Sequence, residues 1–242
     1  DDDVIIPSGT AAYTVTVTTD LDVASLTVGS EEGSIVTNCF KNGIGVNNIA
    51  GDVVVFKNGV LSHSRNPVTV TSVNNVKYKL NLKVGGKMEV YGSVGADLCG
   101  FNKGQALRYA HGGYGGNLNS SKLGTVYGSI REPVDPGAGG QSTIGGDCHG
   151  GGVISLDVER ELIVSGVVSA EGAVDRWDSA SAGGSILIRC ATLCGSGKIY
   201  ARPSSNGNTQ GGGGRIAIYQ SDSTNWDAFV GIISSSNYKT GN

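Results

Sequence analysis

Residues 80–97 read LNLKVGGKMEVYGSVGAD, and residues 154–171 read ISLDVERELIVSGVVSAE. When Leu80 is aligned with Ile154, the main apolar positions, one glycine, one alanine and a closing acid coincide without a gap. A third copy begins at Ile186, a fourth begins at Gly214, and residues 21–36 form a degenerate copy. Self-similarity of this kind indicates a repeat architecture, in which stacked units bury a shared core.

Each copy contains two or three short apolar strands separated by a corner, and helical periodicity is absent. The repeat predicts an all-β chain, folded over residues 1–242 as a single right-handed parallel β-helix. A β-sandwich remains the alternative. Residues 53–56 form a continuous apolar run, which predicts a strand buried on both faces. The predicted core comprises Leu80, Leu82, Val84, Met88, Val90, Ile154, Leu156, Val158, Leu162, Val164, Ile186, Ile188, Leu193, Ile216 and Ile218.

A segment of different composition, residues 98–152, interrupts the repeat. It contains HGGYGG at 111–116, YGS at 127–129 and GAGG at 137–140. A flexible linker would account for so much glycine, but interspersed tyrosines and prolines favour an ordered insertion that lies on the β-helix.

These glycine-rich motifs, with GGGGRIAIY at residues 211–219, resemble a glycine-rich module of large secreted and cell-surface structural proteins. The resemblance covers about residues 78–220. It implies a β-helical fold and a structural role in coats, stalks or mastigoneme-like filaments. It brings no catalytic residues to this chain.

Composition excludes several classes of function. Glycine supplies 40 of 242 residues, more than twice its usual share of roughly 7%. The formal net charge of −3, from 18 basic and 21 acidic residues, lacks the footprint of a nucleic-acid-binding protein. No apolar run is long enough for membrane insertion as a helix.

The five cysteines lack the spacing of a zinc site and favour disulfides in an oxidising compartment. Cys99 and Cys148 flank the insertion, so a bridge between them is the leading prediction. Cys190 and Cys194 fall on opposite faces of one strand, about 13 Å apart unless the chain turns between them. Asn119 begins the one N-glycosylation sequon.

No catalytic or cofactor site is predicted. Asp97 and Glu171 close equivalent repeats, and Asp157 and Glu159 lie on or beside one strand. The third copy carries Arg189 where the second has Asp157, so no carboxylate cluster recurs, and solvated surface acids are favoured over catalysis. The histidines, His63, His111 and His149, lack metal-ligand spacing and are predicted to be structural.

The sequence therefore predicts a secreted structural subunit of an extracellular filament or cell-surface coat, not an enzyme, which assembles with copies of itself or with other subunits. Two alternatives remain. One is a carbohydrate-active β-helix enzyme, a polysaccharide lyase or hydrolase. The other is a glycan-binding adhesin module, which would use exposed aromatic residues such as Tyr91, Tyr109, Tyr114, Tyr127 and Tyr200.

Overall fold

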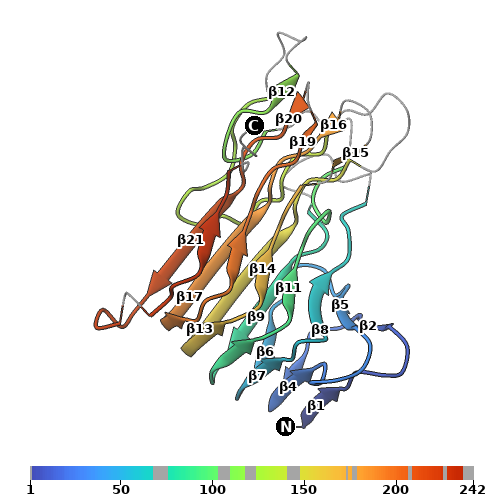
Figure 1. Ribbon diagram of the computed structural model, residues 1–242, viewed down its shortest axis with the longest axis vertical. Helices are drawn as coiled ribbons and strands as arrows, with labels where there is room; N and C mark the ends of the chain where they lie inside the picture. Colours follow the sequence, from blue (N-terminus) through green and yellow to red (C-terminus); the bar gives the residue numbers. More distant parts are fainter. Residues whose placement is uncertain are drawn as a thin grey trace.

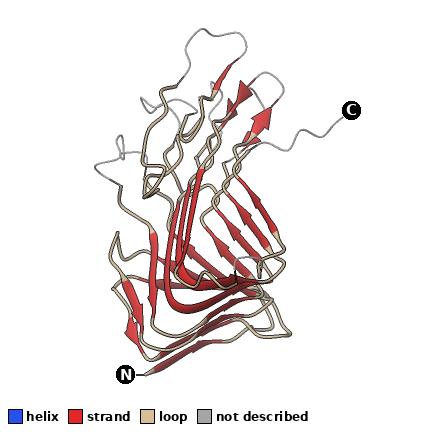
Figure 2. Cartoon of the chain, turned by 90° about the vertical axis from the view of Figure 1, so that its left-hand side faces the viewer, coloured by secondary structure: helices blue, strands red, loops and turns tan. Residues whose placement is uncertain are grey.

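The computed structural model describes residues 2–67, 76–102, 110–117, 124–140, 148–172, 174–175, 179–206, 209–225 and 228–236. This part of the chain is built of strands and connecting segments, without a helix. The strands stack in chain order from the N-terminus upward (Figure 1), and the view turned by 90° shows the chain winding in successive coils (Figure 2).

The strands that form the coils are β1 (Asp3–Ile6), β2 (Tyr13–Val17), β3 (Asp22–Val23), β4 (Ser25–Val28), β5 (Val36–Phe40), β6 (Asn47–Ile49), β7 (Val53–Val55), β8 (Gly59–His63), β9 (Leu80–Val84), β10 (Met88–Val90), β11 (Ser93–Gly95), β13 (Val153–Val164), β14 (Val167–Ser169), β17 (Ser185–Cys194), β18 (Lys198–Tyr200), β21 (Arg215–Gln220) and β22 (Ile232–Ser234). The remaining short strands are β12 (Gly116–Asn117), β15 (Val174–Asp175), β16 (Ser179–Ala180), β19 (Ser205–Asn206) and β20 (Thr209–Gln210).

The two large parallel sheets together form three ladders, because one of the sheets divides into two. The ten-stranded sheet divides because β13 pairs with β9 through its first half and with β10 through its second half, on either side of an irregularity between Val158 and Glu161. Ladder A contains β3, β6, β9, β13, β17 and β21, and ladder B contains β1, β4, β7, β10, β13 and β17. Ladder C is the seven-stranded sheet β2-β5-β8-β11-β14-β18-β22. Successive coils contribute to each ladder in turn, which is the arrangement of a parallel β-helix.

The strand register confirms the repeat read from the sequence. Leu80 pairs with Ile154, Met88 with Leu162 and Val94 with Val168, as the alignment of the first two copies predicts. The third and fourth copies continue the same ladder. The sandwich alternative is wrong because both large sheets are parallel. The antiparallel pairs of the described chain are confined to β12–β20, β19–β20 and β15–β16.

The predicted core lies inside the coils, with two exceptions. Thirteen of its fifteen members are at most 2% exposed. Ile216 and Ile218 are only half-buried, because β21 pairs with β17 on one side and has no strand on the other among the described residues. The prediction that residues 53–56 are buried on both faces is wrong. Val54 is half-buried between two buried valines, because the wall of the β-helix is a single layer with one outer face.

Glycine-rich segments form a second, unusual part of the fold. Segments 98–102, 136–140, 148–152, 180–184 and 210–214 run beside one another and lie next to the amino ends of β13, β17 and β21. The backbone of segment 180–184 is hydrogen-bonded to three of the other segments, at Ala138, Gly151 and Gly212, and also to Ala170 and Ser204. A sheet strand has only two neighbours, so these segments form a bundle rather than a sheet. We call it the glycine bundle.

Close contact between backbones requires glycine in this bundle. A Cβ added to Gly183 would lie 2.0 Å from the carbonyl oxygen of Ala201, which is backbone and cannot move aside cheaply. We expect Gly183→Ala to destabilise the protein by roughly 3 kcal/mol, measured by urea unfolding. Gly95→Ala is the matched control, since its Cβ would meet nothing nearer than 3.5 Å. Equal stabilities of the two variants would contradict the close packing.

Candidate functional site

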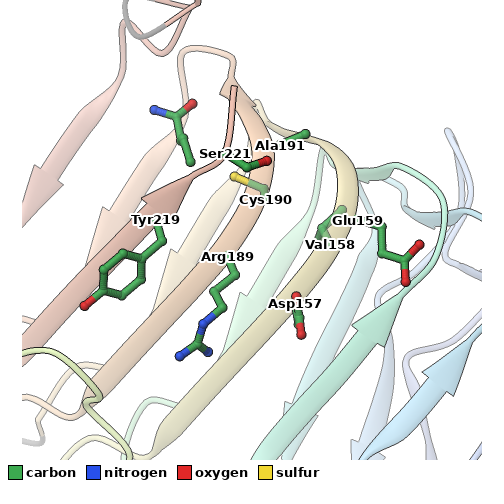
Figure 3. Close-up of a pocket in the computed structure, with 9 residues that line it drawn as sticks. Asp157, Val158, Glu159, Arg189, Cys190, Ala191, Tyr219 and Ser221 are labelled. Atoms are coloured by element: carbon green, nitrogen blue, oxygen red, sulfur yellow. The ribbon is translucent and has the colours of Figure 1, made fainter. Parts of the chain in front are cut away.

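A row of polar side chains follows the outer face of ladder A, one from each coil. Strand pairing places each residue of the row directly above the one before it. In Figure 3, Asp157, Arg189 and Tyr219 project from neighbouring strands on the same side of the sheet. In order along the β-helix, the row is Asp22, Asn48, Lys83, Asp157, Arg189 and Tyr219.

Two hollows lie beside this row where ladder A turns toward ladder B. The upper hollow has a volume of about 280 Å³ and contains Asp157, Arg189 and Tyr219. The lower hollow, of about 260 Å³, contains Asp22, Asn48 and Lys83. Glu159 lines both, so the two hollows lie next to each other in line along the β-helix, and together they are treated as one groove. We call it the axial groove.

The insertion borders the upper end of the axial groove. The Arg189 guanidinium pairs with the carboxylate of Glu132 and lies over the Tyr219 ring, 5.7 Å from its centroid. The Tyr219 hydroxyl donates a hydrogen bond to the backbone oxygen of Arg131 at 2.7 Å. Tyr219 is nevertheless 42% exposed, so its ring is available to a ligand.

Asp97 and Glu171, expected at equivalent positions, do come together at the end of ladder C. The Asp97 carboxylate accepts hydrogen bonds from the backbone N–H of Glu171 at 2.7 Å and from the Ser169 hydroxyl at 3.0 Å. Burial raises the pKa of Asp97. Arg202 pairs with Glu171 and lies 3.8 Å above the centroid of the Tyr200 ring. These interactions link three successive coils, so the cluster has a structural role.

Arg202 was not predicted as part of this cluster, although the alignment of the sequence copies gives its position. The alignment that places Val167 beside Lys198 also places Glu171 beside Arg202. Sequence reasoning likewise identified the outer position of Asp157 and Arg189 but did not extend the row to Lys83 and Tyr219.

All three histidines are buried. His63 Nδ1 lies 2.8 Å from the Ser64 carbonyl oxygen, and its Nε2 accepts the Val153 N–H at 3.2 Å. Burial lowers the pKa of His63 to about 4. His149 Nδ1 lies 3.3 Å from the Gly100 carbonyl oxygen.

His111 anchors the insertion to the glycine bundle. Its Nδ1 lies 2.8 Å from the Gly183 carbonyl oxygen, and its ring lies 5.0 Å from that of Tyr127. Burial lowers its pKa to about 4 as well. Within the described residues, no group of three or more His, Cys, Asp or Glu side chains is placed to hold a metal ion.

The predicted bridge between Cys99 and Cys148 is absent. All five cysteines lie in the described chain, and none forms a disulfide. Cys99 belongs to the β-helix core, where its thiol lies 3.2 Å from the backbone oxygens of His63 and Asp97. Cys148 is buried in the insertion, where its carbonyl accepts the Gly140 N–H. Flanking the insertion in sequence does not bring the two side chains into bonding geometry.

Cys190 and Cys194 lie on opposite faces of β17, as the sequence predicts. Cys190 pairs with Val158 and points into the core, whereas Cys194 pairs with Ile163 and lies 3.0 Å from a carboxylate oxygen of Glu161. Asn119 and Tyr109 lie outside the described residues. Of the other expected aromatic residues, Tyr91 and Tyr114 are exposed, Tyr200 stacks with Arg202, and Tyr127 packs on His111.

The two terminal coils expose apolar side chains that face inward elsewhere in the ladders. Tyr13 on β2 continues the inward row of Val36 but is 38% exposed. Ile233 on β22 continues the inward row of Ile199 but is 48% exposed. Among the described residues, β2 and β22 each have a strand neighbour on one side only. Both ends of ladder C therefore present backbone groups and apolar surface.

Comparison of this chain with protein-family models, with curated proteins and with solved structures found no match. The described residues contain no helix of the length and hydropathy needed to cross a membrane. The terminal coils and the axial groove are therefore the features of the molecule that bear on its function.

Proposed function

We propose that this chain is a structural β-helical unit of a secreted filament or cell-surface coat, and that it assembles end to end with further copies of itself. The observation that carries the proposal is the partial exposure of inward-facing apolar residues at both terminal coils, Tyr13 at one end and Ile233 at the other. The resemblance of the glycine-rich motifs to surface structural proteins supports the same role.

The geometry of the ends favours a second copy as the partner. An exposed edge strand is a template for pairing with another chain, and here every ladder is parallel, so strands of the first coil of one copy can extend the ladders of the last coil of another. Pairing of two different ends is heterologous and does not close on itself, which generates filaments. The half-buried Ile216 and Ile218 would then become fully covered.

Electron microscopy and light scattering of the purified chain test this proposal. We expect concentration-dependent rods longer than one molecule. Ile233→Arg places a charge in the contact and is expected to abolish growth, while Ile130→Arg, at a 73% exposed position on the insertion, is the matched control. Ile233→Arg retains the other end, so adding it in small amounts should shorten wild-type filaments. Monomeric wild-type protein at high concentration would show the proposal to be wrong.

A further inference from the structure

The axial groove consists of two hollows in line along the β-helix, each of them open to solvent. Its outer row runs from Asp22 to Tyr219 through six coils, and with about 4.8 Å between neighbouring strands it extends over roughly 24 Å. The residues that line the hollows next to this row include Ala50 and Gly85 in the lower one and Ala191 in the upper one, which leave room because they carry little or no side chain. Such a shape fits a linear chain laid along the β-helix better than a compact small molecule.

The side chains of the groove combine hydrogen-bonding groups with one aromatic platform. Asp157, Glu159 and Lys83 form no hydrogen bond or ion pair through their side chains to other residues of the described chain. They can therefore bond to a ligand without first breaking an internal contact. Tyr219 adds a half-exposed ring at the upper end, and the Arg189 guanidinium lies against one face of this ring. Donors, acceptors and a flat ring suit a ligand with many hydroxyl groups and apolar ring faces.

The groove carries charges of both signs. Three acidic residues, Asp22, Asp157 and Glu159, lie along it with two basic ones, Lys83 and Arg189. The charge of Arg189 is already paired with Glu132. A polyanion such as a polyuronate or a nucleic acid would meet repulsion from the three acids, and a polycation would meet repulsion from Lys83. An uncharged chain experiences neither penalty.

We propose that the axial groove binds a linear, uncharged polysaccharide along the axis of the β-helix, with one sugar ring stacked on Tyr219. The rise from coil to coil is comparable with the length of one pyranose unit, so successive coils present polar groups to successive sugars. This inference goes beyond the assembly proposed above and does not depend on it, because the groove lies on the side of each unit rather than at its ends.

Calorimetric titration with hexasaccharides tests the proposal. The probes are cellohexaose, chitohexaose and mannohexaose as neutral chains, and hexagalacturonate as a charged chain. At least one neutral hexasaccharide should bind, at least about tenfold more tightly than its own disaccharide, because the longer chain contacts more coils. The charged chain should bind more weakly than that neutral chain.

Variants locate the binding. Tyr219→Ala should weaken binding about tenfold, whereas Tyr219→Phe, which keeps the ring and loses only the hydrogen bond to Arg131, should retain it. Ala191→Trp should block the floor of the upper hollow. Tyr91→Ala, at an exposed tyrosine outside the groove, is the matched control and should bind normally.

Three results would overturn the proposal. One is the failure of every neutral hexasaccharide to bind. Another is tighter binding of hexagalacturonate. The third is equal binding by Tyr219→Ala and Tyr91→Ala when circular dichroism shows both to be folded. Filament formation is measured separately, so a failure of the groove is distinguishable from a failure of assembly.

Discussion

Leu156→Asp is expected to leave the chain unfolded. Leu156 is fully buried and lies in ladder A between Leu82 and Ile188, which are also fully buried. A carboxylate at this position would have no polar partner. Burying an unpaired charge costs more than the free energy of unfolding of a typical domain, which is on the order of 10 kcal/mol. Ile188→Asp should have the same effect.

Circular dichroism and size-exclusion chromatography measure this outcome. Arg160→Asp is the control, because it places the same carboxylate on the same strand, β13, at an exposed position. It should change the free energy of unfolding by about 0.5 kcal/mol or less. A folded Leu156→Asp protein would mean that the assigned inward row is wrong.

Acidification is expected to destabilise the protein strongly between pH 6.5 and pH 4. Burial lowers the pKa of both His63 and His111 from 6.5 to about 4, so the unfolded chain binds protons that the folded chain does not. Their neutral forms therefore stabilise the fold fully above pH 6.5, and this stabilisation is lost as the pH falls toward 4. Each shift corresponds to about 3 kcal/mol.

Urea unfolding at pH 7.5 and pH 4.5 measures the loss. His111→Gln removes one titrating group, so its free energy of unfolding should depend less on pH than that of the wild type. Asp97 and Asp135 contribute with the opposite sign, because their raised pKa values favour the folded state as pH falls. This contribution is the same in the wild type and in His111→Gln, so it cancels when the two proteins are compared. An unchanged pH dependence in His111→Gln would contradict the prediction for that residue.

The coil architecture could be predicted from the sequence because a β-helix repeats its packing. Positions such as Leu82, Leu156 and Ile188 occupy the same inward site in successive coils, so one alignment predicts three neighbours at once. The same logic correctly placed Cys190 and Cys194 on opposite faces. Polar residues inside the core, in contrast, could not be predicted from the repeat. Asn38 is fully buried in an inward row beside Leu61, without a partner for its amide group among the described residues.

The glycine bundle and the axial groove could not be predicted in the same way. Residues 211–214 are four consecutive glycines that precede a strand, and they contact Ser181, Ala182 and Gly113 from separate parts of the chain. Glycine carries no side-chain pattern from which such neighbours can be inferred. The groove lies where ladder A turns toward ladder B, and the register shift between Val158 and Glu161 at this point leaves no clear signal in the sequence.

The two parts of the molecule differ in the chemical groups that they remove from water. The coils bury leucine, isoleucine and valine, whereas the glycine bundle buries mainly peptide groups and the methyl groups of residues such as Ala138 and Ala182. Exposure of apolar surface raises the heat capacity on unfolding, and exposure of peptide groups lowers it. The bundle should therefore contribute little to the heat-capacity change. Since the hydrophobic stabilisation of the coils weakens on cooling, the bundle provides a growing share of the protein's cohesion toward low temperature.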